Sequence, residues 1–276
     1  MPNTQPTAGN LLRTWRQRRR MSQLELAVEA EVSQRHLSFV ESGRSVPSRD
    51  MILHLAERLA IPLRERNVVL AAAGFAPVYQ ERNLADPALV AQREAIEVVL
   101  KGHEPFPALA VDRHWTLVAA NAAIEPLIVG IDAKLLEPPL NVLRLSLHPE
   151  GMAPRIVNYP EWKAHVITRL TQQVDASADA GLNALLEELK AYPRPRGAAI
   201  AVPQAKRDFA NVVVPLQLMT DAGVLSFFST TTVFGTPVDI TLAEIAIEAF
   251  YPADKATADA VRKAASAKPS KPRGGR

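Results

Sequence analysis

The stretch from Ser22 to Gly43 reads SQLELAVEAEVSQRHLSFVESG, and it decides the fold of the N-terminal part of the chain. Ser22 and Glu25 have the spacing of a capping box, in which the serine hydroxyl and the glutamate carboxylate satisfy free amides at the start of a helix. Ser33 can cap a second helix, and Gly43 can end it in the left-handed conformation. Two short helices joined by a tight turn are therefore predicted.

Helical spacing of apolar residues continues on both sides of this pair, over residues 11–73. We expect one Arg-rich helix before the pair, and two more helices after it that begin near Pro47 and Pro62. Leu24, Ala27 and Val28 are expected to form the apolar face of the second helix. Five helices in so short a segment predict a compact all-α domain over residues 8–75.

The composition predicts a soluble protein with more than one domain. The chain has 276 residues, which is long for a single small domain, and 47% of them are apolar. It has no cysteine, so disulfides, thiolate metal sites and cysteine nucleophiles are excluded. The apolar runs are too short for a membrane span, and the first ten residues lack the apolar core of a signal peptide. We therefore expect a cytoplasmic protein with no membrane partner.

Charge is unevenly distributed along the chain. Residues 1–83 hold twelve Arg and eight acidic residues, whereas residues 254–276 hold seven basic and two acidic residues. The segment between them is net acidic, because the whole chain carries only +3. A basic N-terminal segment followed by an acidic segment is typical of a protein that binds phosphate through its N-terminal part only. A charged surface that is merely solvated explains the distribution equally well.

The remainder of the chain predicts a mixed α and β domain over residues 105–254. A connector over residues 76–104 contains a helix from Asp86 to about Leu100. A β-hairpin over 109–118 turns at residues 112–114, and Asn121 opens a helix. Further predictions are helices over 160–175 and 180–191, strands over 211–219 and 224–234, a last helix from Thr241 in which Ile245, Ile247 and Phe250 pack on the sheet, and a disordered basic tail over 255–276.

The N-terminal domain resembles the lambda-repressor-like, or XRE, helix-turn-helix domains. The resemblance rests on Ser22-Gln23-x-x-Leu26-Ala27, on Val32-Ser33 and on Glu41-x-Gly43. Family members usually carry glycine where this chain has Glu31, and a non-glycine residue with positive φ costs about 1 kcal/mol. The resemblance implies a domain that binds double-stranded DNA, with a tight turn that is slightly rearranged.

In this geometry the third helix lies in the major groove, with its N-terminal residues against base edges. Gln34, Arg35 and Ser38 are then the predicted base readers, and Ser33 at the start of the helix is also a predicted DNA contact. Gln can contact adenine and Arg can contact guanine through two hydrogen bonds each. Gln23 and Arg44 are predicted to contact phosphate, which would position the domain without reading sequence. The alternative is that Gln34 and Arg35 are ordinary exposed residues.

A second resemblance extends over almost the whole chain, to the MmyB-like regulators, which join an XRE domain to a PAS-like ligand-binding domain. The matching stretches include Val111-Asp112-x-x-Trp115, His148-Pro149-x-Gly151, Asn158-x-x-Glu161-Trp162, Phe234-Gly-Thr-Pro237 and Phe250-Tyr-Pro-Ala-Asp254. The resemblance implies an α+β PAS-like domain and a transcriptional regulator that responds to a small molecule. A fatty acid or similar apolar molecule is the effector that it suggests.

Strand 224–234 mixes Phe, Leu and Thr and could line a ligand pocket, which would need one cation for a carboxylate. Arg155 is the first candidate for this cation and His148 is the second. Asn158, Phe227 and Phe228 complete the predicted ligand site. The alternative is that Arg155 makes an internal ion pair and that the Phe residues are only core.

An enzyme is not expected, since the chain lacks the nucleophile-elbow, zinc-protease, P-loop and dinucleotide-binding motifs. Its six histidines are scattered without metal-ligand spacing, so neither a metal nor a cofactor is predicted. A regulator whose second domain only dimerises or binds a protein partner remains the alternative function. A single helix-turn-helix touches about one half-site, so a homodimer is expected.

Overall fold

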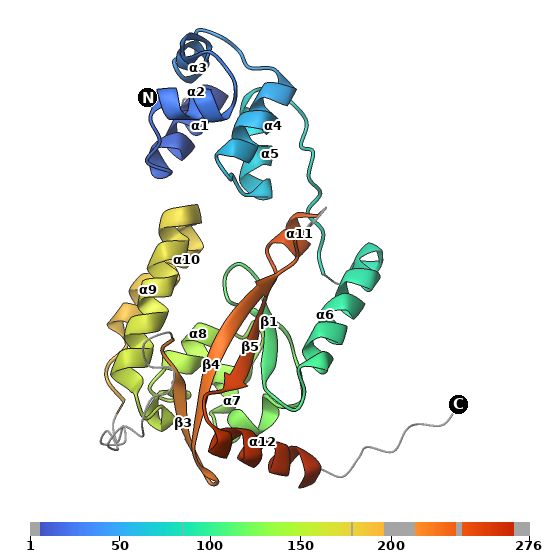
Figure 1. The fold of residues 1–276 in the computed structure, drawn as a ribbon, viewed down its shortest axis with the longest axis vertical. Coiled ribbons are helices and arrows are strands. Elements are labelled where there is room, and N and C mark those ends of the chain that lie inside the picture. Colours follow the sequence, from blue (N-terminus) through green and yellow to red (C-terminus); the bar gives the residue numbers. More distant parts are fainter. Residues whose placement is uncertain (1–5, 85, 178, 196–212, 236–238, 268–276) are drawn as a thin grey trace. The chain divides into compact units, whose positions relative to one another are not determined.

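A computed structural model describes residues 6–84, 86–177, 179–195, 213–235 and 239–267. The chain divides into two compact units, which are described separately (Figure 1). The first unit contains Met1–Asn83 together with Asp175–Ser177 and Thr236–Ala243, and the second contains the rest. None of the described helices is both long enough and apolar enough to cross a membrane.

The first unit contains the five helices that were predicted. They are α1 (Ala8–Arg18), α2 (Gln23–Glu29), α3 (Gln34–Glu41), α4 (Arg49–Arg58) and α5 (Leu63–Ala72). Four of them begin at a side-chain cap, in which the hydroxyl of Thr7, Ser22, Ser33 or Ser48 accepts from a backbone amide of the first turn. The capping box of α2 is complete: Ser22 Oγ accepts from the amide of Glu25, and the Glu25 carboxylate accepts from the amide of Ser22.

The core of this unit is apolar and fully enclosed. Leu12, Leu26, Leu37, Ile52 and Leu70 are each at most 1% exposed. The apolar face predicted for α2 was partly wrong. Ala27 is buried, but the buried stripe is completed by Leu26 and Ala30, which leaves the side chains of Leu24 and Val28 56% and 68% exposed.

Two backbone features set the geometry of the helix pair. Glu31 adopts a φ of +52° in the turn between α2 and α3, so the chain keeps the left-handed turn that glycine usually makes there. Gly9 brings α1 against the end of α3, because a Cβ atom added at Gly9 would lie 2.0 Å from the carbonyl oxygen of Val40. Only a residue without a side chain allows this approach.

The second unit is built on one antiparallel sheet. Its strands are β1 (Ala108–Val111), β2 (Leu117–Ala120), β3 (Leu216–Thr220), β4 (Gly223–Val233) and β5 (Ala246–Pro252). They lie in the order β2-β1-β5-β4-β3. The hairpin predicted over residues 109–118 is β1 paired with β2. The order of the strands and the helices around them make this an α+β domain with a PAS-like fold, as expected.

Helices join and cover the strands (Figure 1). A 3₁₀ turn, η1 (Pro87–Leu89), leads into α6 (Val90–Gly102) before β1. Between β2 and β3 lie η2 (Glu125–Leu127), α7 (Ala133–Leu136), α8 (Val142–Leu147), η3 (Ala153–Arg155), α9 (Tyr159–Ser177) and α10 (Ala180–Ala191). The helix predicted from Asn121 is thus only the short η2, because the buried Asn121 side chain bonds to the backbone of residues 100, 106 and 108.

The two faces of the sheet belong to two apolar clusters. Ala108 and Ala110 of β1 face α6, where Ile96 and Leu100 are buried with them. Leu109 and Val111 point to the opposite face, as alternation along a strand requires. That second face packs against α8, α9 and α10, and it forms the larger of the two clusters.

The helix predicted from Thr241 was wrong in extent. A short helix, α11 (Ile240–Ala243), ends before Glu244, and the following residues form β5, which pairs with β1 on one side and β4 on the other. Ile247 and Phe250 are therefore members of the sheet, whereas Ile245, just before β5, is buried against Ala108 and Ala110 of β1. Hydrogen bonds to two distant strands outweigh the weak local preference of this segment.

The disordered tail predicted from residue 255 was wrong for its first part. Helix α12 (Lys255–Ala267) follows β5, and Thr257 is only 1% exposed. Asp254 caps the amide of Thr257, and the Thr257 hydroxyl accepts from the amide of Ser226 on β4. Alanine-rich sequence has a high helix propensity, and these two polar contacts dock it without large apolar residues. The end of the predicted tail, residues 268–276, and the start of the strand predicted at 211 lie outside the described residues.

Candidate nucleic-acid interface and ligand cavity

Helix α3 presents polar side chains at its first turn. Ser33 is the N-cap, and its hydroxyl accepts from the amide of His36 at 3.1 Å. Gln34 and Arg35 follow it and are exposed, whereas Ser38 is half-buried one turn later. The Arg35 guanidinium lies 5.5 Å from the ring centroid of Phe39. Such an arrangement leaves the donors and acceptors of Gln34 and Arg35 available to an outside partner.

A buried ion pair holds the C-terminal end of α3 against α1. Arg16 donates from Nε and Nη2 to the two carboxylate oxygens of Glu41, at 2.6 and 2.8 Å. Glu41 is 2% exposed and Arg16 is 8% exposed. Burial alone would raise the pKa of Glu41, but the hydrogen bonds from Arg16 and Gln23 outweigh it and lower that pKa. The hydrogen bond to Glu41 raises the pKa of Arg16.

Gln23, predicted as a phosphate contact, belongs to this network. Its Nε2 donates to Glu41 Oε2 at 2.8 Å, and the residue is half-buried at the start of α2. The network therefore joins α1, α2 and α3 through one carboxylate. Gln23 has one structural bond, and any contact to phosphate would be made in addition to it.

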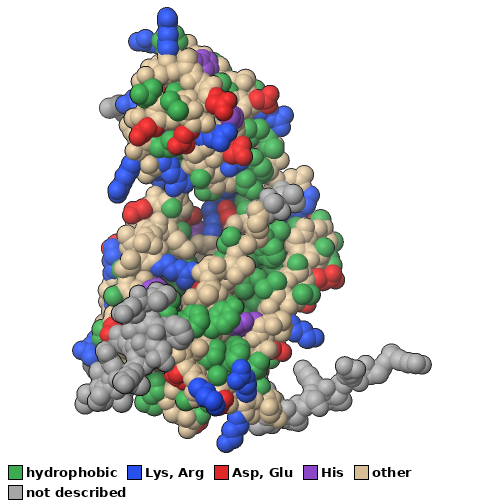
Figure 2. All heavy atoms as spheres, viewed as in Figure 1, with side chains coloured by type: hydrophobic (Ala, Val, Ile, Leu, Met, Phe, Trp, Pro, Cys, Tyr) green, Lys and Arg blue, Asp and Glu red, His purple; other side chains and the backbone are tan. Residues whose placement is uncertain are grey.

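Arg44 lies in the loop after α3 and is exposed, as are Arg13, Arg18 and Arg20 around α1. Figure 2 shows basic side chains, coloured blue, that stand out from the surface of this unit in the upper part of the view, and since residues 1–83 hold no lysine they are arginines. Exposed guanidinium groups attract phosphate. These arginines can therefore contact a nucleic-acid backbone.

The second unit contains an apolar cavity of about 110 Å³. It lies between the sheet face that carries Leu109 and the helices α8 and α9. Its walls are almost wholly hydrophobic, and they are formed by Leu109, Trp115, Leu117, Ile124, Leu127, Ile128, Leu140, Val142, Leu143, Leu145, Met152, Trp162, Val166, Leu216, Phe227 and Phe250. A concave, mostly apolar cavity with a few polar groups is the usual form of a small-molecule site.

Five residues supply the polar groups of this wall: Ser146, His165, Arg169, Ser229 and Glu248. Arg169 on α9 donates to the two carboxylate oxygens of Glu248 on β5, at 2.5 and 3.0 Å. The same guanidinium lies over the ring of Trp115, 4.6 Å from its centroid. Among the described residues, no group of three or more His, Asp or Glu side chains could hold a metal ion.

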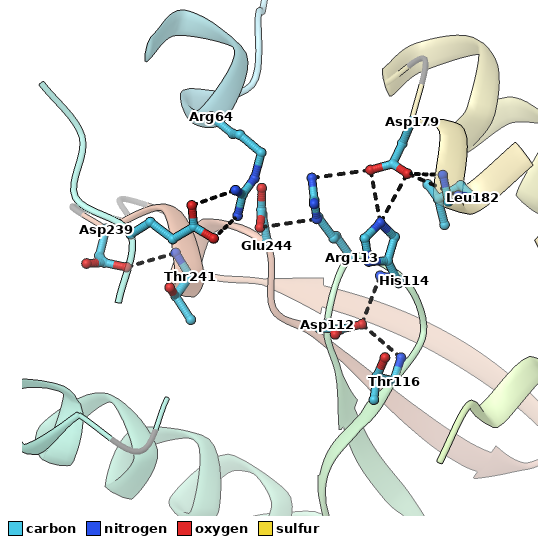
Figure 3. A network of polar contacts seen from close by, with 12 residues as sticks. Arg64, Asp112, Arg113, His114, Thr116, Asp179, Leu182, Asp239, Thr241 and Glu244 are labelled. Carbon is cyan, nitrogen blue, oxygen red and sulfur yellow. Dashed lines mark hydrogen bonds and ion pairs between the residues drawn. The ribbon is translucent and has the colours of Figure 1, made fainter. Parts of the chain in front are cut away.

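Trp115 reaches the cavity from a constrained turn between β1 and β2. It has a φ of +66° and is 4% exposed, and its indole N–H donates to Gln173 at 2.8 Å. The Asp112 carboxylate accepts from the amides of His114 and Thr116, both at 2.8 Å (Figure 3). The turn is therefore held by its own side chains in a conformation that non-glycine residues seldom adopt.

The two residues before Trp115 fasten this turn to neighbouring elements (Figure 3). His114 Nε2 lies 3.0 Å from the carboxylate of Asp179, which caps α10. Arg113 lies 3.2 Å from the same carboxylate and 3.7 Å from Glu244. Burial alone would raise the pKa of Asp179, but the hydrogen bonds from Leu182 and His114 outweigh it and lower that pKa. These contacts fix the position of the indole that closes one side of the cavity.

The structure brings few of the predicted ligand residues to the cavity. Phe227 lines it, whereas Phe228 points to the other face of β4 and stacks on Tyr251. Asn158 bonds to the backbone of Pro215 and Gln217, which ties the start of α9 to β3. His148 accepts from the amide of Glu150.

Arg155 lies outside the cavity wall. Its guanidinium donates to the carbonyl oxygens of Leu127 and Val129, at 2.9 and 3.2 Å, and of Met219, at 3.4 Å. These acceptors are backbone carbonyls, and among the described residues Arg155 has no carboxylate partner of the kind that the alternative expected. The guanidinium at the cavity is that of Arg169.

Arg169 was missed although its helix was predicted. Trp162, Val166 and Arg169 recur at the spacing of one helix face, which places an arginine on the apolar side of α9. An arginine on a buried face indicates a buried partner or a ligand, and this signal was present in the sequence. The partner, Glu248, was not recognisable, since its segment was predicted to be helical.

Comparisons with known proteins agree with both units. The model of the MmyB-like transcription regulator ligand binding domain matches residues 92–264, and a helix-turn-helix domain model matches residues 8–69. No curated protein gives a significant match. A solved structure titled "Structure of an RNA-binding Light-Oxygen-Voltage Receptor" is similar at 13% identity, over 95% of this chain and 65% of that chain, with a TM-score of 0.24. The chain thus spans slightly less than two thirds of that structure's length.

Proposed function

This chain belongs to the MmyB-like transcription regulators, and we propose that it binds operator DNA through α3 and responds to a small apolar molecule in the cavity beside Trp115. Its two matched domains are those of a DNA-binding transcriptional regulator with a ligand-sensing domain, and both are of regulator type rather than enzymatic. The observation that carries the proposal is the cavity itself, which lies within the matched ligand-binding domain.

The proposed DNA contacts are divided between two kinds of residue. Gln34, Arg35 and Ser38 read base edges, since they lie on the first turns of α3. This helix is capped by Ser33, and its C-terminal end is fixed to α1 by the Glu41–Arg16 ion pair. Arg44 contacts phosphate, and Gln23 does so beside its bond to Glu41. We further propose a homodimer on a palindromic operator, because one such module covers about one half-site.

The proposed ligand has an alkyl or acyl chain, the class to which fatty acids and their derivatives belong. The cavity walls are leucine, isoleucine, valine and aromatic side chains, which favour such a chain through the burial of apolar surface. We place its polar end near Arg169 in preference to Arg155, since only Arg169 lies on the cavity wall.

The test has two parts that use the full chain. Selection from a random DNA pool, followed by light scattering of the complex, should recover a palindromic site bound by two copies. Tryptophan fluorescence should report ligands, because Trp115 and Trp162 line the cavity. If no DNA sequence is enriched, the reading role of α3 is wrong. A chain that selects DNA but binds no apolar molecule would favour a second domain that serves only dimerisation or a protein partner.

A further inference from the structure

The polar end of the cavity is electrically balanced. Two nitrogens of Arg169 face the two oxygens of Glu248, and the Thr231 hydroxyl also donates to Glu248 Oε1 at 2.7 Å. Glu248 is 3% exposed, so its charge is held by these donors and hardly by water. One positive and one negative charge therefore meet at the wall, and neither is in excess.

A carboxylate ligand would disturb this balance. If it displaced Glu248 from Arg169, it would leave a buried carboxylate without its partner, which is strongly destabilising. If it accepted from the N–H groups of Arg169 that Glu248 does not use, its charge would be moved from water into an apolar cavity next to a carboxylate. A cationic ligand meets the same difficulty, since Arg169 lies beside Glu248.

Neutral hydrogen-bonding groups are available at the same wall. The described residues provide no hydrogen-bond partner for the ring of His165 or for the hydroxyl of Ser229, and both line the cavity. Burial lowers the pKa of His165, and the charge of Arg169 lowers it further against the opposing effect of Glu248. The imidazole is therefore neutral at neutral pH, and one ring nitrogen donates while the other accepts.

The volume limits the size of the ligand. An apolar cavity of about 150 Å³ holds one benzene molecule, and the cavity of about 110 Å³ is smaller. An apolar body of about six carbon atoms is thus the upper limit for the present volume. A longer chain would fit only if the cavity walls moved.

Resting on the proposed sensing role of this cavity, we infer that the effector is an uncharged small amphiphile. Its apolar body fills the cavity, and one hydroxyl or carbonyl group hydrogen-bonds to His165 and Ser229. The free carboxylate of a fatty acid is excluded by the Arg169–Glu248 pair, whereas the corresponding alcohol or ester is accepted.

The test compares three ligands of one chain length with the full protein. We expect 1-hexanol to bind at least about tenfold more tightly than hexanoate and than hexylammonium at pH 7, measured by tryptophan fluorescence. Hexanoate that binds as tightly as 1-hexanol overturns the inference and leaves the sensing role intact. If toluene and all three ligands fail to bind, the proposed function of the cavity is wrong.

Two variants separate charge from hydrogen bonding. Glu248→Gln leaves Arg169 without a counter-charge, so hexanoate should gain at least about tenfold in affinity while hexylammonium should not. His165→Phe leaves the ion pair intact and should weaken 1-hexanol by about threefold to tenfold without improving hexanoate. Unchanged 1-hexanol binding by His165→Phe, or unchanged hexanoate binding by a folded Glu248→Gln variant, contradicts the inference.

Discussion

At the scale of single residues, Arg35 and Arg44 are both exposed arginines near α3, yet their expected roles differ. Arg35→Ala should cost about 1–3 kcal/mol of specific DNA affinity and relax the preference at one base pair. Arg44→Ala should weaken all sequences alike and reduce the salt dependence of binding. Titrations against single-base operator variants at two salt concentrations distinguish the two outcomes, and an Arg35→Ala variant with unchanged base preference would remove Arg35 from the readers.

Glu41 links the stability of the first unit to pH. Its pKa in the folded protein lies below the ordinary value of 4.5, so its stabilising effect is complete above that value. The effect is lost as the pH falls through the lowered pKa of the folded state, because the unfolded chain then binds the proton first. We expect Glu41→Gln to unfold more easily than the wild type at pH 7 and to show a smaller loss of stability between pH 5 and pH 3.

Circular dichroism melts of both chains across this range would show the difference. Other carboxylates with a lowered pKa, such as Asp179 and Glu188, titrate in both chains and therefore cancel in the comparison. Parallel pH profiles of the two chains would show that Glu41 does not carry this dependence.

At the scale of elements, the contact between α1 and α3 depends on Gly9. Gly9→Ala would place a methyl group 2.0 Å from the Val40 carbonyl oxygen, so one helix must move. Overpacking of this kind costs about 1–3 kcal/mol. Gly102→Ala is the matched control, since a Cβ atom at Gly102 meets nothing within 4 Å. Hydrogen exchange should show faster exchange in α1 and α3 for Gly9→Ala alone; equal protection in both variants would disprove the close contact.

Helix α12 contacts the sheet through the buried hydroxyl of Thr257. Thr257→Val keeps the shape of the side chain but leaves the amide of Ser226 without its acceptor, which should cost about 1–3 kcal/mol. Ser266→Ala changes an exposed hydroxyl on the same helix and should have almost no effect. Thermal unfolding compares the two, and an unaffected Thr257→Val variant would mean that α12 is not docked in solution.

At the scale of the whole molecule, sensing requires that ligand binding and DNA binding influence each other. A bound effector that changes operator affinity by some factor must bind to the operator complex with an affinity changed by the same factor. With 1-hexanol as the probe, we expect a coupling of about fivefold or more, the lower end of typical allosteric effects. Titrations in both orders test this equality. Saturation of the cavity with no change in operator affinity would separate the cavity from regulation.

The sequence by itself determined the features that depend on near neighbours. Serine caps, the capping box at Ser22 and Glu25, and helical spacing all act within a few residues, so the first unit was predicted almost completely. The β1–β2 hairpin and helices α9 and α10 were predicted for the same reason. The exposed side chains of Leu24 and Val28 show the limit, because which of several apolar residues faces the core depends on the neighbouring helices.

Only the tertiary structure decided what distant segments do together. β5 is a strand because β1 and β4 hydrogen-bond to it from both sides, while its own sequence is compatible with a helix. The same pairing places Glu248 against Arg169, 79 residues earlier in the chain, and so creates the polar end of the cavity. A lone arginine on α9 could be noticed in the sequence, but its counter-charge could not be assigned, since Coulomb attraction depends on distance in space and not on separation along the chain.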